Sequence, residues 1–327
     1  MFSYLTRRLI NWLVIIVVST NITYFLAWNF LDPRSNYVGR RPPLTAEEVD
    51  NLLRPRNLST EVPLLERWWT WITDIVLHWN WGVTPEGDSV NRQIAFRMWT
   101  SAEFVTGATL IGLVVGVSLG VYTANRQYKL ADRIGHFTST ITMNIPPIVA
   151  ALGFVLLAIM LNEATGITIF YVTGPSGIGI DNWFVAVLDT LHRLILPTLA
   201  MSLVGYASTH FLQRALLLDN IGADYVRTAR AKGLTKQRAI RKHALRTSLI
   251  PIATQVAFTI PTVFLGAFLS EVIFAWHGLG EYTVAALGKN DIHGTVAIAA
   301  FGALMTGVGA LLADVAVVAL DPRVRVS

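Results

Sequence analysis

The sequence predicts an all-α membrane protein with six transmembrane helices, and its composition and charge pattern carry that prediction. Of its 327 residues, 53% are hydrophobic and only 14% are charged, whereas soluble proteins average about 25% charged residues. The charges are clustered, which leaves long stretches with few or none. A helix that crosses a bilayer needs about 20 mainly apolar residues, and six stretches of the chain meet this requirement. The absence of cysteine excludes a disulfide framework and thiolate chemistry, but it does not identify a compartment.

The six apolar stretches are expected to form the membrane spans. Their expected bounds are Leu9–Leu31, Ala102–Ala124, Phe137–Leu161, Leu191–Leu212, Ile250–Ala275 and Thr295–Leu320. The first stretch follows Arg7 and Arg8, and it is longer than the roughly 7–15 apolar residues of a signal peptide. Because no Ala-x-Ala-like cleavage site follows it, we interpret it as a retained first span.

The distribution of basic residues selects the orientation of the chain. The N-terminus, the segments 126–133 and 214–246, and the C-terminal tail together hold sixteen Lys and Arg residues and only four acidic residues. The segment 32–100, by contrast, holds eight Arg and nine acidic residues. Because cytoplasmic loops carry an excess of Lys and Arg, both termini are predicted to be cytoplasmic. The expected organisation is an N-terminus with the first span (1–31), an extracytoplasmic segment (32–100), a five-helix core (101–320) with a cytoplasmic loop (213–249), and a cytoplasmic tail (321–327).

The predicted extracytoplasmic segment is too long for a simple turn, so it is expected to be structured. Thr45 and Glu48 have the spacing of a capping box that opens a helix over Ala46–Leu53. A second helix is predicted to begin at Pro63. Its apolar side is expected to consist of Leu64, Leu65, Trp68, Trp69, Ile72 and Val76. The segment is either an anchor in the headgroup region, where Trp is favoured, or a platform for an extracytoplasmic partner.

Motifs for catalysis and nucleotide binding are absent from the sequence. There is no Gly-x4-Gly-Lys-Ser/Thr, so the chain itself is not expected to bind ATP phosphates. There is no His-Glu-x-x-His and no Gly-x-Ser-x-Gly, and the His residues are scattered across predicted opposite sides of the membrane. The Gly-rich stretch 174–179 precedes no Lys and is interpreted as a turn. We therefore predict no catalytic residue, no cofactor and no metal site.

Charged, proline and glycine residues inside the predicted spans mark candidate pathway or packing positions. Glu271 lies near the outer end of the fifth span and Asp314 lies inside the sixth, and such charges are costly in lipid and often functional. For Asp314 we favour a helix–helix hydrogen bond or a snorkelling contact over a place on a pathway. Glu103, at the start of the second span, is interpreted as interfacial. Prolines and repeated glycines with Gly-x3-Gly spacing predict a kinked, tightly packed bundle. They are Pro146, Pro147, Pro197, Pro251, Pro261, Gly112, Gly116 and Gly120.

The predicted cytoplasmic loop is strongly basic, with nine Lys and Arg residues between Arg214 and Arg246. Asp224 is the predicted N-cap of a short helix whose C-terminal cations suit the helix dipole. Gly233 fits a left-handed stop after that helix, and Thr235 is expected to cap a second basic helix. Taken alone, this helix–turn–helix is interpreted equally well as a docking surface for a partner and as a basic stripe on anionic lipid headgroups.

Four stretches of the chain carry a resemblance to a known family. They are Asp224-Tyr-Val-Arg-Thr-Ala-Arg-Ala-Lys-Gly-Leu followed by His243-Ala-Leu-Arg-Thr-Ser-Leu-Ile-Pro251, then Tyr4-Leu-x-Arg7-Arg8-Leu, then Gly266-Ala-x3-Glu271-Val-Ile-Phe-x-Trp276-x-Gly278-Leu-Gly280, and finally Asp314 with Asp321-Pro-Arg323. The first resembles the coupling loop of ABC importer permeases, and the others resemble the start, the end of the fifth span and the C-terminus of the B-type subunits in the peptide (oligopeptide/dipeptide) and nickel branch. The resemblance covers essentially the whole chain.

Departures from the general motif sharpen this assignment. The general importer motif begins with Glu-Ala-Ala six residues before its Gly, where this chain has Arg227, Thr228 and Ala229. It later has Ile-x-Leu-Pro, where this chain has His243-Ala-Leu-Arg246. Both changes are usual in the peptide branch. His277 replaces the Pro that is common after the Trp, so the geometry of that loop stays open.

The resemblance implies a type I ABC importer permease subunit of the bacterial inner membrane, which forms half of a peptide pathway and is not itself an enzyme. Its implied partners are a homologous second permease, cytoplasmic ATPases that bind the ATP, an extracytoplasmic substrate-binding protein and membrane lipids, and no nucleic acid is expected. The residues implied to contact the ATPase are Asp224, Tyr225, Arg227, Thr228, Ala229, Arg230, Lys232 and Gly233. The residues implied to support the loop are His243, Leu245, Arg246 and Pro251.

Other functions are kept as alternatives. An importer permease for nickel or another small solute fits the same branch. A stand-alone channel or secondary transporter would need pathway charges or internal repeats, which are scarce, and it would leave the basic loop unexplained. A membrane enzyme would need a catalytic constellation, and the sequence offers none.

Overall fold

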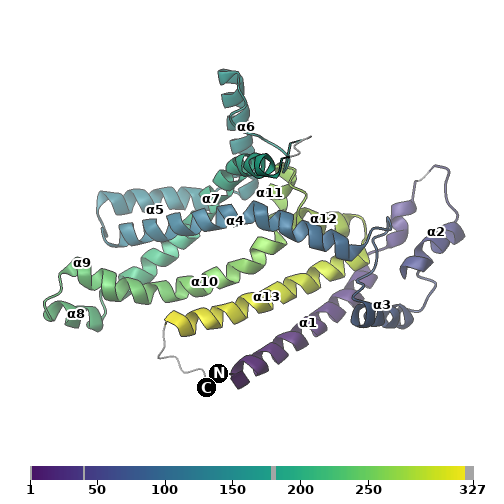
Figure 1. Cartoon of the computed structure of the whole chain (residues 1–327), viewed down its shortest axis with the longest axis horizontal. Coiled ribbons are helices and arrows are strands. Elements are labelled where there is room, and N and C mark those ends of the chain that lie inside the picture. The colour runs from purple at the N-terminus through teal and green to yellow at the C-terminus, as the bar shows by residue number, and fades with distance from the viewer. Residues whose placement is uncertain (1, 40, 178–181, 321–327) are drawn as a thin grey trace. The chain divides into compact units, whose positions relative to one another are not determined.

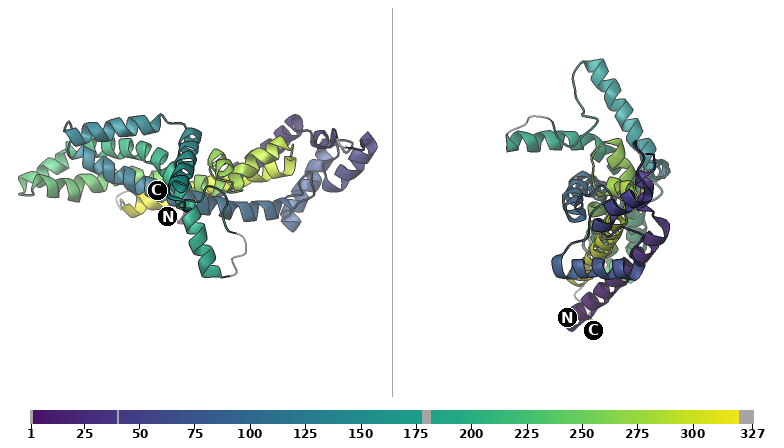
Figure 2. Two further views of the ribbon diagram at one scale, coloured as in Figure 1. Left: turned by 90° about the horizontal axis from the view of Figure 1, so that it is seen from above. Right: turned by 90° about the vertical axis from the view of Figure 1, so that its right-hand side faces the viewer.

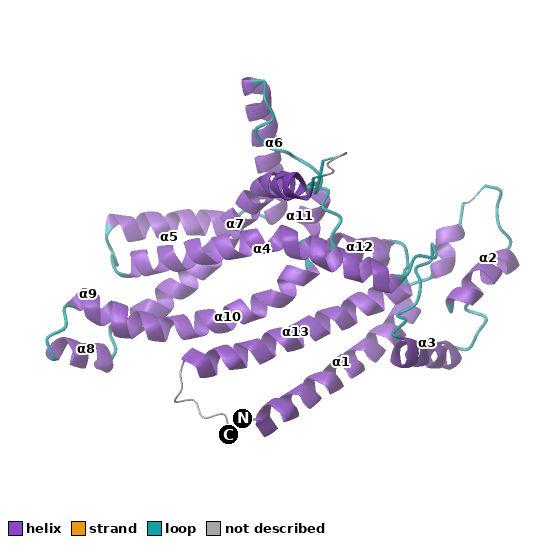
Figure 3. Cartoon of the chain, in the orientation of Figure 1, coloured by secondary structure: helices purple, strands orange, loops and turns teal. Residues whose placement is uncertain are grey.

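The computed structural model describes residues 2–39, 41–177 and 182–320 and divides into two compact units. The described residues form helices and loops and no strand (Figures 1 and 3), which confirms the predicted all-α class. Within the described residues, six helical segments are long and apolar enough to cross a membrane, in agreement with the six predicted spans. The predicted tail 321–327, with the Asp321-Pro-Arg323 motif, lies outside the described residues, as does part of the Gly-rich stretch.

The helices of the described residues follow one another in this order along the chain. They are α1 (Phe2–Phe30), α2 (Ala46–Leu53), α3 (Leu64–His78), α4 (Val90–Ala124), α5 (Leu130–Met143), α6 (Pro147–Thr165), α7 (Trp183–Ile221), α8 (Asp224–Ala231), α9 (Lys236–Ala239), α10 (Leu245–Leu265), α11 (Phe268–Ile273), α12 (Leu279–Gly288) and α13 (Ile292–Leu320). Two short 3-10 turns, η1 (Pro33–Tyr37) and η2 (Arg54–Arg56), flank α2, and a π-helical turn, η3 (Ile240–Ala244), joins α9 to α10.

The first unit comprises Met1–Ala102, Phe264–Phe268 and His277–Val308, and its core ties the outer segment to two membrane helices. Tyr24 of α1 stacks on Trp71 of α3 with 4.5 Å between the ring centroids. Ile292 and Val296 of α13 belong to the same buried cluster. The outer segment is therefore a folded part of this unit.

Both helices predicted in the outer segment are present. The capping box of α2 is formed as predicted, because Thr45 N donates to Glu48 Oε2 (2.7 Å) and Glu48 N donates to Thr45 Oγ1 (3.3 Å). Helix α3 is present as predicted, and it begins at Leu64, one residue after the predicted start, with Pro63 as its N-cap.

The apolar side predicted for α3 is wrong in part. Leu65, Trp69 and Val76 are exposed, whereas Trp71 is buried. The packed stripe instead runs through Trp68, Trp71, Ile72 and Ile75, which is the spacing of one helix face. The sequence pattern favoured the wrong part of α3 because its large apolar residues cover a broad arc of the helix, and contact with α1 selects which of them are buried.

The predicted third span Phe137–Leu161 is wrong as a single helix. Helix α5 ends at Met143, and α6 begins at Pro147. Pro147 occupies the first helical position, where its missing N–H costs nothing, while a Pro disfavours helix in the residue before it. Of the two helices, only α6 is apolar and long enough to span, and α5 packs against α7 instead.

The second unit comprises Glu103–Val263, Leu269–Trp276 and Gly309–Ser327, and in it α4 and α7 approach each other closely. A Cβ added at Gly116 would lie 2.7 Å from the carbonyl oxygen of Tyr206, and one at Gly120 would lie 2.9 Å from that of His210. The Gly-x3-Gly spacing thus places bare backbone of α4 against α7. Because α4 begins at Val90, Glu103 lies within the helix, with its side chain exposed, rather than at the helix start.

Replacing Gly116 with Ala should destabilise this unit, since the added methyl group meets the backbone of α7 and overpacking typically costs about 1–3 kcal/mol. Gly153→Ala in α6 is the matched control, because a Cβ there meets nothing within 4 Å. We expect a lower thermal unfolding midpoint for purified Gly116→Ala and an unchanged or higher midpoint for Gly153→Ala. Equal midpoints for the two variants would contradict the close approach of α4 and α7.

Candidate coupling site and membrane cavity

The predicted basic helix–turn–helix is present, at one end of α7 and α10 (Figures 1 and 2). Helix α8 begins one residue earlier than predicted, because Ala223 is the N-cap and Asp224 is the first helical residue. No side chain caps this helix. The Asp224 carboxylate lies 3.6 Å from the guanidinium of Arg227, with both groups exposed, and it also suits the positive end of the helix dipole.

The stop and restart of the chain after α8 are confirmed. Gly233 has φ +93°, in the left-handed region that glycine adopts without penalty, and its N–H donates to Arg230 O (3.0 Å). Thr235 Oγ1 then accepts a hydrogen bond from Arg238 N (3.4 Å) and caps α9. From α9 the chain continues as helix through η3 into α10, so the loop leads directly into the fifth span.

Helix α8 has one packed face and one exposed face. On the packed face, Val226 is 2% exposed and Ala229 is 8% exposed, and both contact a buried cluster that includes Leu217 of α7 and Ile240 and Ala244 of η3. We name this packed surface the α8 seat. The seat packs α8 against the end of α7 and against the helix that leads into α10.

The structure divides the residues of the predicted coupling site between the two faces. Ala229 packs into the α8 seat, so its contact is with its own chain. The others are exposed, namely Asp224, Tyr225, Arg227, Thr228, Arg230, Lys232 and Gly233. Among the predicted supporting residues, Leu245 packs against the same buried cluster, His243 is half-buried, and Arg246 and Pro251 are exposed.

An ion pair joins α5 to α7 in the same unit. Arg214 donates two hydrogen bonds to Asp132, from Nε to Oδ1 (2.7 Å) and from Nη2 to Oδ2 (2.9 Å). Asp132 is 4% exposed, and it also accepts from Tyr128 N (2.9 Å). The hydrogen bonds from Arg214 lower the pKa of Asp132, because they stabilise the charged carboxylate.

A polar network that sequence reasoning missed lies one turn away on α7. His210 is fully buried. Its Nδ1 lies 2.7 Å from Ser139 Oγ of α5, and its Nε2 lies 3.0 Å from Thr123 Oγ1 of α4. Gln213 Nε2 donates to Ser248 Oγ of α10 (3.0 Å). The network therefore links four helices, and the polar residues grouped on one face of α7 were the signal that could have revealed it.

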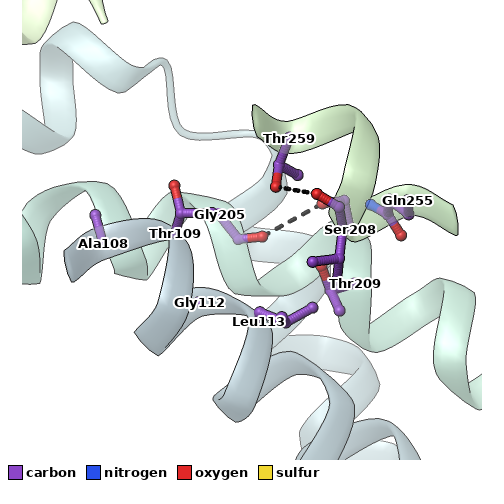
Figure 4. A pocket seen from close by; sticks show the side chains of 10 residues that line it. Ala108, Thr109, Gly112, Leu113, Gly205, Ser208, Thr209, Gln255 and Thr259 are labelled. Atoms are coloured by element: carbon purple, nitrogen blue, oxygen red, sulfur yellow. Dashed lines mark hydrogen bonds between the residues drawn. The ribbon is translucent and has the colours of Figure 1, made fainter. Parts of the chain in front are cut away.

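A cavity of about 190 Å³ lies between α4, α7 and α10 (Figure 4). It is lined by Ala108, Thr109, Gly112, Leu113, Gly205, Ser208, Thr209, Gln255, Val256 and Thr259. Hydroxyl and amide groups line it beside small residues, and none of these residues is charged. Sequence reasoning did not find the cavity, because its walls come from three helices far apart in the chain.

The two acidic residues proposed for a pathway do not line this cavity. Glu271 is fully buried within α11, at 0% exposure, in agreement with its expected position at the end of the fifth span. Asp314 is half-buried in α13. Neither acidic residue belongs to the cavity lining.

The loop after α11 explains one departure from the family pattern. Ala275 and His277 both have left-handed backbone, with φ +51° and +41°. Proline is held near φ −65°, so this conformation excludes proline at His277. His277 Nδ1 lies 2.8 Å from Glu281 Oε2, and its carbonyl accepts from Arg97 Nη1 (3.2 Å).

Six apolar helical segments and a structured basic loop define a polytopic α-helical membrane protein. The loop packs against the end of α7 and continues as helix into α10. Comparison with known proteins identifies the family of membrane proteins to which the chain belongs. Residues 116–326 match the family described as "Binding-protein-dependent transport system inner membrane component", and the chain belongs to this family, the permease subunits of bacterial ABC importers. It is therefore a multi-pass protein of the bacterial inner membrane, and such permeases work with ATPase and substrate-binding subunits.

Curated relatives support the same family. The chain is 36% identical to the oligopeptide transport system permease protein OppB of Mycobacterium tuberculosis, over 100% of both chains. It is 31% identical to the oligopeptide transport system permease protein AppB of Bacillus subtilis, over 74% of each chain. It is 26% identical to the dipeptide transport system permease protein DppB of Escherichia coli, over 76% of this chain and 80% of that protein.

Replacing Asp132 with Asn should destabilise the protein, since a charge-assisted hydrogen bond contributes about 1.5–3 kcal/mol. Asp219→Asn, at an exposed position of α7, is the control and should change the unfolding midpoint little. The effect should depend on pH. The pKa of folded Asp132 lies below its ordinary value of 3.8, so the stabilisation is complete above that value and is lost as the pH falls through the folded pKa.

The measurement is thermal unfolding of the wild type and both variants across pH. We expect a constant difference between Asp132→Asn and the wild type from neutral pH to about pH 5, and a smaller difference at the acidic end. A difference that grows on acidification would show that Arg214 does not stabilise this carboxylate.

Proposed function

We propose that this chain is one of two homologous permease subunits of a peptide importer, and that movement of the cytoplasmic ATPases enters it through α8. The observation that carries the proposal is the two-faced α8, which has exposed polar and basic residues on one side and the α8 seat on the other. Its relatives support the peptide substrate, since they are named as oligopeptide and dipeptide permeases.

The exposed face of α8 has the chemistry of a protein-docking helix. Tyr225, Arg227, Arg230 and Lys232 offer one aromatic ring and three cations on a short, well-defined element. Tyr225 OH donates to Asn220 Oδ1, which orients the ring towards the end of α7. A rigid helix that presents such side chains suits a groove on another protein, whereas lipid binding alone would need no such seat.

The route from α8 into the membrane is short and rigid. A displacement of α8 is passed through Val226 and Ala229 to α7 and to η3. The buried polar network then ties α7 to α4, α5 and α10, so these helices respond as a body. This is the arrangement that a rigid-body switch requires.

In this proposal the chain forms part of the pathway and moves during transport, and its partners carry out the chemical reaction. ATP is bound and hydrolysed by the cytoplasmic ATPases, so the chain needs no cofactor and no catalytic residue. A substrate-binding protein delivers peptide on the outer side, where the folded segment between α1 and α4 offers it a surface. Both termini, α8 and the basic loop lie in the cytoplasm.

Charge reversal at Arg230 should uncouple the ATPases from the permease. Arg230→Glu places an acid on the exposed face of α8 without touching the α8 seat. We expect the ATP hydrolysis stimulated by the loaded binding protein to fall several-fold in the reconstituted complex. Lys129→Glu, an equally exposed position in the loop before α5, is the control and should retain stimulation. Undiminished stimulation in Arg230→Glu would contradict docking through α8.

The substrate class is tested by uptake into proteoliposomes that hold the assembled importer and its binding protein. We expect ATP-dependent accumulation of short peptides, with no accumulation of nickel ions under the same conditions. Accumulation of nickel without peptide would replace peptide by the metal as substrate, while leaving the role of α8 intact.

A further inference from the structure

We propose that the cavity between α4, α7 and α10 forms part of the pathway wall and that its uncharged acceptor groups bind the backbone N–H groups of the passing peptide. The inference rests on the proposed function, since it requires a peptide substrate. It assigns the contact to Ser208, Gln255 and Thr259, which line the cavity from α7 and α10 (Figure 4).

The position of these residues argues against a lipid-facing surface. All of the cavity lining comes from three of the six candidate membrane spans. Polar groups at such positions are costly in hydrocarbon, and they persist where they face protein or a water-filled space. A cavity lined by four hydroxyl residues and one amide is therefore a candidate for an aqueous or ligand-filled space.

The hydrogen bonds of these side chains leave acceptors available. Thr259 Oγ1 donates to Val256 O (2.7 Å) and Ser208 Oγ donates to Gly205 O (3.3 Å). Each hydroxyl thus uses its proton within its own helix and keeps its lone pairs. Gln255 Oε1 is buried and has no hydrogen-bond partner among the described residues. Such an orphaned acceptor costs free energy unless a ligand or water satisfies it.

These acceptors match the one feature that all peptides share. A peptide in extended conformation offers backbone N–H donors whatever its side chains are. The cavity lining carries no charge, so it does not favour acidic or basic side chains. A wall of this kind holds the backbone weakly and without sequence preference, as a pathway for varied peptides requires.

The size and shape of the cavity fit one wall of a larger site. Its volume of about 190 Å³ is below the roughly 300–1,000 Å³ of a complete small-molecule site. Gly205 is exposed, and a Cβ there would meet nothing within 4 Å, so the wall is open beside Ser208. A second permease subunit supplies the remaining walls.

Cysteine accessibility tests the inference directly, because the chain contains no cysteine. Ser208→Cys and Thr259→Cys are each placed in the assembled importer in proteoliposomes. Val114→Cys, which is exposed on another face of α4 (63%), is the lipid-facing control. The modification rate by a charged, water-soluble thiosulfonate is read as a mass shift of this chain, with and without a transported tripeptide, binding protein and ATP.

We expect Ser208→Cys and Thr259→Cys to be modified at least about tenfold faster than Val114→Cys, since thiolate forms in water and not in lipid. The transported tripeptide should slow the modification. Rates equal to that of Val114→Cys would overturn the inference, as would fast modification that no transported peptide slows. Peptide uptake by the importer that contains the wild-type chain is measured first, so a failure of the proposed function is seen before any labelling.

A second pair of variants tests the hydrogen bond itself. Thr259→Val removes the hydroxyl group and preserves shape, and we expect uptake to fall roughly two- to tenfold, the range for one lost hydrogen bond. Thr254→Val is the control, since Thr254 also bonds to its own helix (Oγ1 to Ile250 O, 3.3 Å) but does not line the cavity. Equal uptake by both variants would overturn the contact at Thr259.

Discussion

The packing of Val226 and Ala229 into the α8 seat is the contact on which the rest of the proposed mechanism depends. Without it, α8 would be a basic helix on a flexible loop, able to bind a partner but unable to move a span. The seat is small, but it engages the end of α7 and the start of the helix that becomes α10. A load on the exposed face therefore acts on two spans together, and buried hydrogen bonds around His210 extend it to α4 and α5.

Much of this architecture could be predicted from local patterns in the sequence. Hydropathy identified six spans, and the chemistry of Thr45, Gly233 and Thr235 located turns and caps, because these features depend on neighbours in the chain. The predictions were wrong in two places for two different reasons. The buried face of α3 is selected by tertiary contact with Tyr24, whereas the break before Pro147 follows from local backbone geometry that a hydropathy average cannot resolve.

The candidate site likewise has features that could be predicted from the sequence and features that could not. The exposed face of α8 could be predicted, because its residues lie within one short motif. Its N-terminus was misplaced by one residue, since an Asp suits both the cap and the first turn. The network at His210 and the cavity at Gln255 could not be predicted, because each joins helices that are distant in sequence and emerges only once α4 and α7 pack together at Gly116 and Gly120.

The continuity of α9, η3 and α10 has a mechanical consequence. These 30 residues form one helical rod, and at about 1.5 Å per residue its length is about 45 Å. If the rod tilts by about 10° around its loop end, its far end moves through about 8 Å. A small rotation at the loop end of the rod is therefore magnified into a larger displacement at its far end.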